Sequence, residues 1–114
     1  MAIDVRAKLA ERGLTLPVAA KPVAAYLPAV RTGQIVFTAG QLPLVDGAMA
    51  GTGKVGAEIT QERAKELAEI CALNCLAAVE LVAPVDMIVK VVFGFNALLL
   101  EDFPMHFLKS LTER

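Results

Sequence analysis

At 114 residues, the chain has room for one domain (1–114) with a single modest hydrophobic core. Its formal net charge is −1 and the sequence has no basic stripe, whereas a nucleic-acid binder typically carries clustered positive charge. We therefore do not expect RNA or DNA as a partner. The apolar share of 56% exceeds the usual share of about 45–50%, so we expect part of the apolar surface to be covered in a homo-oligomer. No apolar run approaches the roughly 18 residues that span a bilayer, so we expect a soluble protein without membrane association.

The first part of the sequence predicts a short helix and then an extended arm. Apolar residues at helical spacing favour an N-terminal helix over residues 3–12, and Gly13 supplies its stop. The same stretch contains neither the apolar core nor the cleavage site of a signal peptide, which leads us to expect a cytoplasmic protein. Between residues 14 and 28, three prolines exclude a regular helix and favour an extended crossing.

Two turn signals organise the strands that follow. Residues 25–31 and 34–39 flank Thr32-Gly33 and predict a β-hairpin, in which Pro28 confines the first strand to a sheet edge. Asp46-Gly47 is the second turn signal. Around it we expect an extended segment at 41–45, a glycine-rich loop at 48–53 and a short strand at 54–57.

Residues 61–83 predict one long helix, with Thr60 as its N-cap and Pro84 as its end. Apolar residues cover most of its circumference from residue 70 onward, so we expect the helix to be covered on two sides. One predicted inward face consists of Leu67, Cys71, Asn74, Ala78 and Leu81.

The remaining sequence predicts a central strand over residues 87–93, because an almost unbroken apolar run suits a buried position in a sheet. Residues 97–114 form a mixed apolar and basic tail. Together these elements predict an α+β fold, with an antiparallel or mixed sheet of three to five strands packed on one long helix.

Several familiar motifs fail on inspection. The Gly51–Lys54 segment invites a phosphate-loop interpretation, but Ala48 and Val55 stand where that motif needs glycine and Ser or Thr. Cys71 and Cys75 share a helix face without a second ligand pair, so we interpret them as core residues and expect no metal. His106 has no acid partner at a diagnostic spacing, which argues against a hydrolytic triad.

An ordered set of segments resembles the Rid family of imine deaminases, also called YjgF or endoribonuclease L-PSP proteins. Tyr26 lies thirteen residues before Ala39-Gly40, which matches the spacing of the family's pocket tyrosine from its strand end. Segment 33–41 resembles the family's strand, segment 53–60 its next strand and helix cap, and segment 72–78 the inward face of its helix. The resemblance extends over about residues 22–95.

This resemblance implies a chorismate-mutase-like α+β fold, assembled into homotrimers with small-molecule clefts between subunits. In those clefts the family hydrolyses imines or enamines such as 2-aminoacrylate to 2-keto acids and ammonia, without metal or organic cofactor. It implies substrate-binding roles for Tyr26, Ala39 and Gly40, and leaves the catalytic residues unassigned.

The sequence also departs from the family pattern. Ala39 replaces a serine found in many active members, and the family's carboxylate-binding arginine follows a second long helix that residues 1–114 do not reach. We therefore expect a sheet that is incomplete at its C-terminal end. Two hypotheses stay open: an imine or enamine deaminase, and a non-catalytic small-molecule-binding or protein-interaction module of the same fold, which the missing arginine favours.

Overall fold

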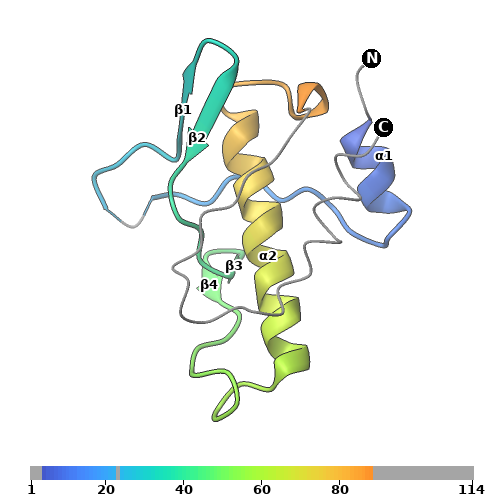
Figure 1. Ribbon diagram of the computed structural model, residues 1–114, viewed down its shortest axis with the longest axis vertical. Coiled ribbons are helices and arrows are strands. Elements are labelled where there is room, and N and C mark those ends of the chain that lie inside the picture. Colours follow the sequence, from blue (N-terminus) through green and yellow to red (C-terminus); the bar gives the residue numbers. More distant parts are fainter. Residues whose placement is uncertain (1–3, 23, 89–114) are drawn as a thin grey trace.

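The computed structural model describes residues 4–22 and 24–88. Two helices and two β-hairpins make up this part of the chain, followed by a 3₁₀ turn (Figure 1). The elements are α1 (Val5–Ala10), β1 (Ala29–Thr32), β2 (Ile35–Thr38), β3 (Leu44–Val45), β4 (Ala48–Met49), α2 (Gln61–Glu80) and η1 (Val85–Met87).

The first hairpin joins β1 and β2 in antiparallel register. Thr32 pairs with Ile35, so the two turn residues are Gly33 and Gln34 rather than the predicted Thr32-Gly33. Gly33 has φ +55°, as a primed turn with glycine at its first central position requires. The first strand begins at Ala29 and not at residue 25, because Pro28 has no N–H for a ladder; its carbonyl still accepts the Ala39 N–H at 2.9 Å.

The second hairpin confirms the Asp46-Gly47 turn signal. Both residues have positive φ, 50° and 81°, which is the geometry of a type I′ turn between β3 and β4. β4 falls where a loop was predicted.

The strand predicted over residues 54–57 is wrong. Gly53 and Gly56 have φ +135° and +88°, which break the extended backbone on either side of a single bridge between Val55 and Ile59. The chain folds back there as a turn, in which the Lys54 carbonyl accepts the N–H groups of Ala57 and Ile59 at 3.1 Å.

The long helix α2 begins as predicted. The Thr60 hydroxyl oxygen accepts the Arg63 N–H at 3.1 Å, which satisfies one of the free donors in the first turn. The helix ends at Glu80 rather than residue 83, and tighter bonds from Leu81 N–H to Ala78 and from Val82 N–H to Val79 close it. Leu81, predicted to face inward, is 58% exposed because it lies beyond the regular helix.

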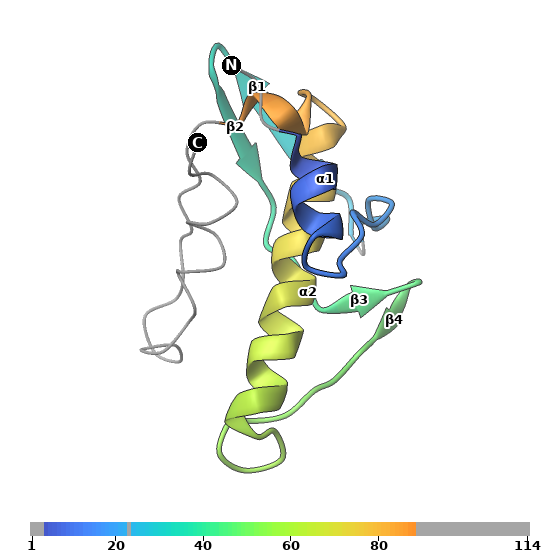
Figure 2. The ribbon, with the colours of Figure 1, turned by 90° about the vertical axis from the view of Figure 1, so that its right-hand side faces the viewer.

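The core holds α1 against the C-terminal half of α2. Val5, Leu9, Leu76 and Val85 are buried together, with Leu14, Leu16, Leu73 and Ile88 packed around them. A hydrogen bond from Val5 N–H to Asp86 Oδ1 (2.9 Å) and an ion pair between Arg6 and Glu80 add polar links at the same end. In Figures 1 and 2, α1 and the hairpins lie on different sides of α2, so this apolar helix is covered on two sides, as predicted.

The structure confirms an α+β fold with antiparallel strands and one long helix. Within residues 4–88, however, the strands form two separate two-stranded sheets and not one sheet of three to five. Met87, the predicted start of a central strand, lies in η1; residues 89–93 and the tail at 97–114 fall outside the described part. No helix in the described part is long and apolar enough to cross a membrane.

Candidate functional site: a pocket beside Tyr26

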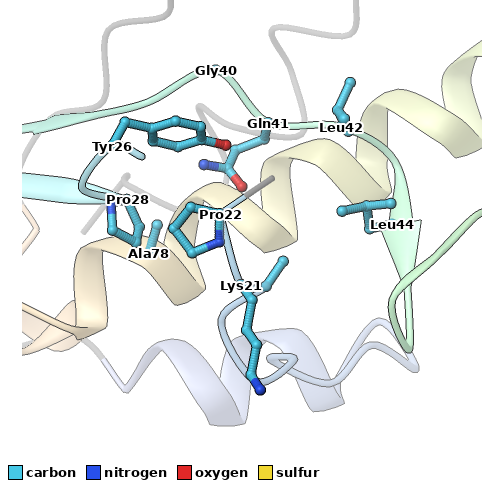
Figure 3. A pocket seen from close by; sticks show the side chains of 10 residues that line it. Lys21, Pro22, Tyr26, Pro28, Gly40, Gln41, Leu42, Leu44 and Ala78 are labelled. Atoms are coloured by element: carbon cyan, nitrogen blue, oxygen red, sulfur yellow. The ribbon is translucent and has the colours of Figure 1, made fainter. Parts of the chain in front are cut away.

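A small open pocket lies where the extended arm crosses the segment after β2, next to the last turns of α2 (Figure 3). The hydrogen bond between Ala39 N–H and the Pro28 carbonyl extends the first hairpin by one pair and brings these two segments together. The pocket is lined by Ala20, Lys21, Pro22, Tyr26, Pro28, Gly40, Gln41, Leu42, Leu44 and Ala78.

Tyr26 reaches the pocket from a tight bend in the arm. Its backbone N–H bonds to the Ala24 carbonyl at 2.9 Å, and the residue is 42% exposed. Among residues 4–22 and 24–88, the hydroxyl has no hydrogen-bond partner. Tyr26 therefore presents a polar group that is free to donate to or accept from a ligand.

Gly40 forms another wall of the same pocket. Among the described residues, no atom lies within 4 Å of a Cβ placed on it, so this part of the chain leaves it open. Tyr26 and Gly40, for which the family resemblance implies substrate contacts, thus line the same pocket. Ala39 is not a lining residue: its carbonyl oxygen accepts a hydrogen bond at 3.0 Å from Gln41 Nε2.

Sequence reasoning missed Gln41 and Lys21 as lining residues. Gln41 is half-buried and lines the pocket, and Figure 3 shows the Tyr26 hydroxyl pointing toward its side chain. Lys21 is the charged residue of the lining, but its ammonium group extends away from Tyr26 and Gly40. Gln41 had a signal, since it follows Ala39-Gly40 directly; Lys21 had none.

Asn74 anchors the pocket wall from behind. It is 3% exposed, and its Nδ2 donates to the carbonyls of Leu42 at 3.1 Å and Leu44 at 3.0 Å. The signal in the sequence was a polar side chain on the apolar face of α2. Its role is to fix the segment that follows Gln41.

The cavity volume of about 20 Å³ is roughly what one water molecule needs. A three-carbon acid does not fit inside such a space, so a ligand bound here rests against an open wall. A further surface over the mouth would be needed to enclose it.

The cysteines lie apart from this pocket, on the face of α2 toward β2. Cys75 Sγ is 3.3 Å from Thr38 Oγ1, and burial raises the pKa of both the Cys71 and Cys75 thiols. Over the described ranges, no group of three or more His, Cys, Asp or Glu side chains could hold a metal ion.

The glycine-rich loop before α2 is closed by its own carboxylate. Glu58 Oε2 accepts the Lys54 backbone N–H at 2.8 Å, and this bond lowers the pKa of Glu58. A carboxylate thus occupies the donor that a phosphate would use, in agreement with the rejected phosphate-loop interpretation.

Comparison with known proteins places the chain in a structural class. It matches no family model. A crystal structure of a "putative endoribonuclease" from Shewanella oneidensis MR-1 has a TM-score of 0.70 and 25% identity, covering 76% of this chain and 58% of that one. The chain therefore shares its small α+β fold, with antiparallel strands and one long helix, with the Shewanella structure.

Two further relatives are more similar in sequence. Protein TCP17 of Trypanosoma cruzi is 34% identical over 76 residues, which cover 67% of this chain and 48% of that protein. The crystal structure of Atu1372, a protein with unknown function from Agrobacterium tumefaciens, has 35% identity and a TM-score of 0.61, covering 73% of this chain and 48% of that one. The chain thus spans about half the length of these two relatives.

Proposed function

We propose that this chain is a Rid-like protein with a chorismate-mutase-like fold, which binds a small carboxylated imine or enamine beside Tyr26. The observation that carries the proposal is the shared pocket: Tyr26 and Gly40 line one cavity, although they come from different segments. These are residues for which the family resemblance implies substrate contacts. The fold shared with the Shewanella structure supports the same class.

The reaction we propose is hydrolysis of a 2-imino acid. Water adds to the C=N carbon, the resulting carbinolamine expels ammonia, and a 2-keto acid remains; an enamine first tautomerises to the imine by moving a proton to carbon. Tyr26 and the open surface at Gly40 would orient the planar substrate, because correct placement of substrate and water lowers the barrier without a covalent step. The proton-transferring residue is unassigned.

A second copy of the chain would complete the site in this proposal. A cavity of about 20 Å³ cannot enclose an organic acid, and the ammonium group of Lys21 extends away from Tyr26 and Gly40. A neighbouring protomer would cover the mouth and supply positive charge for the carboxylate. A homotrimer with inter-subunit clefts is the assembly that the resemblance implies.

Two alternatives have specific support. A non-catalytic binding module would keep the pocket and bind the same acids without turnover. Ala39 supports this alternative, because it stands where many active family members have a serine. The second alternative is RNA cleavage, which the name of the Shewanella structure suggests. We favour a small acid over RNA, because the net charge is −1 and Lys21 is the one charged residue among the described residues that line the pocket.

The test supplies 2-aminoacrylate from a pyridoxal-phosphate-dependent lyase and follows pyruvate with lactate dehydrogenase. We expect the full chain to accelerate pyruvate release, and Tyr26→Phe to slow it. Pyruvate binding is measured in parallel by NMR. Binding without acceleration supports the non-catalytic module, whereas absence of both, or cleavage of a labelled RNA by the purified chain, overturns the proposal.

A further inference from the structure

We infer that Gln41 is a specificity residue: its carboxamide oxygen accepts the N–H of an imine or enamine ligand and so distinguishes the nitrogenous substrate from its oxo product. This inference rests on the function proposed above and adds a role for a residue outside the predicted site.

One hydrogen bond determines the orientation of the Gln41 side chain. Its partner at 3.0 Å is the carbonyl oxygen of Ala39, which can only accept. The amide nitrogen must therefore face Ala39, and the choice between the two possible amide orientations is settled by chemistry. The carboxamide oxygen Oε1 is left on the other side, with no hydrogen-bond partner among residues 4–22 and 24–88.

The backbone on both sides of Gln41 is held in place. On one side, Ala39 N–H bonds to the Pro28 carbonyl at 2.9 Å; on the other, Asn74 Nδ2 holds the Leu42 carbonyl at 3.1 Å. Gln41 is itself half-buried. A side chain fixed at its base and through its amide nitrogen loses little conformational entropy when its oxygen binds a ligand.

The free oxygen lies in the same pocket as the free hydroxyl of Tyr26. Both residues line the cavity, and Figure 3 shows the Tyr26 hydroxyl directed toward the Gln41 carboxamide. Oε1 can only accept a hydrogen bond, whereas a hydroxyl can do either. The pair therefore suits a ligand that presents an N–H donor to Gln41 and a second polar group to Tyr26.

This arrangement favours substrate over product. An imine or enamine nitrogen carries the N–H that Oε1 needs, but the oxygen of a 2-keto acid brings lone pairs toward another acceptor. One net hydrogen bond corresponds to a preference of about two- to tenfold in affinity. Exchange of nitrogen for oxygen would thus assist product release.

The test uses two stable acids that differ at the relevant group. 2-Acetamidoacrylate carries an N–H beside a carboxylated sp² carbon, and methacrylate carries a methyl group there. We expect the wild-type chain to bind the first about two- to tenfold more tightly by NMR titration, and Gln41→Met, which keeps the unbranched shape without an acceptor, to bring the ratio to about one. Gln34→Met, in the exposed β1–β2 turn, is the matched control and keeps the wild-type ratio.

The outcomes separate the inference from the proposed function. A wild-type chain that binds neither acid nor pyruvate overturns both. A wild-type chain that binds pyruvate but shows no preference between the two acids, or a folded Gln41→Met protein that keeps the preference, overturns only the role of Gln41. If Gln41→Met does not fold, Gln41→Leu takes its place, because it also removes the acceptor oxygen: loss of the preference supports the role of Gln41, and a retained preference overturns it.

Discussion

At the scale of single residues, Asn74 supports the pocket without lining it. Its two hydrogen bonds to the Leu42 and Leu44 carbonyls are the side-chain links between α2 and the segment after Gln41. Asn74→Ala would take the Asn74 donor from both carbonyls beside a buried helix face; the Leu42 carbonyl would keep the Leu44 N–H at 2.8 Å, whereas the Leu44 carbonyl would lose its bond to α2. We expect a loss of about 2 kcal/mol in the free energy of unfolding, measured by urea denaturation.

Lys65→Ala is the control for this substitution, because Lys65 is exposed on the same helix; it should change stability by less than about 0.5 kcal/mol. Equal effects of the two substitutions would show that the Asn74 hydrogen bonds do not hold the wall.

Two glycines have different expected roles: Gly40 allows a ligand to approach the backbone, and Gly47 allows a backbone conformation with positive φ. A Cβ at Gly40 meets no atom of the described part of the chain, so Gly40→Ala should fold normally and weaken binding of pyruvate through the added methyl group. Gly47 has φ +81°, so Gly47→Ala strains the β3–β4 turn and should cost about 1–2 kcal/mol. Thermal melts measure the stability of both variants, and NMR titration measures their binding of pyruvate. If Gly40→Ala binds pyruvate as tightly as wild type, Gly40 is not part of the binding site.

The two thiols give stability a pH dependence on the alkaline side. Burial raises the pKa of Cys71 and Cys75, which means that the folded chain binds their protons more tightly than the unfolded chain. Their contribution is fully present below the unfolded value of about 8.5 and is lost as pH rises through the raised folded values. We expect the melting temperature of wild type to fall more steeply between about pH 8 and 10 than that of Cys71→Ala/Cys75→Ala; parallel curves would contradict this.

At the scale of elements, the turn at Asp46-Gly47 and the start of α2 at Thr60 could be predicted from sequence, because each depends only on residues next to it in the chain. Asp46-Gly47 and the Thr60 cap have local causes, namely positive φ and a free N–H in the first helical turn. Two failures have local causes that the sequence did not make plain. Gly53, just before residues 54–57, and Gly56, within them, adopt positive φ, and α2 tightens after Glu80 before it reaches Pro84.

The site was predicted only in part, because tertiary contacts decide the rest. Tyr26 and Gly40 came from a family pattern, and both line the pocket. The lining role of Gln41 depends on which way its amide turns toward Ala39, and that of Lys21 on where the arm crosses the chain. Neither follows from composition or spacing.

The Thr60 cap allows a direct test of the predicted start of α2. Thr60→Ala removes the acceptor for Arg63 N–H, and we expect a loss of about 1 kcal/mol measured by urea denaturation. Thr52→Ala, in the exposed loop before the helix, is the control and should leave stability nearly unchanged. A cap substitution without effect would indicate that the first turn of α2 adds little to the stability of the fold.

At the scale of the whole molecule, one face of the first hairpin is apolar and uncovered within the described chain. Val30 and Phe37 are paired across the strands, and Ile35 lies two residues from Phe37 on the same face. They are 48%, 60% and 57% exposed, respectively. A contiguous apolar face of this kind is typical of an interaction surface, which fits the proposed homo-oligomer.

This face makes the assembly testable with one substitution. Light scattering on the full chain at micromolar concentration should give a multiple of 12.1 kDa, with three copies expected from the family resemblance. Phe37→Asp places a charge in the middle of the apolar face and should shift the mass toward one copy, because a buried unpaired charge is costly at an interface. Val18→Asp is the control, since Val18 is 93% exposed on the arm, and it should leave the mass unchanged. A folded wild-type monomer would contradict both the assembly and the completed cleft, whereas an oligomer that survives Phe37→Asp would move the interface to another face.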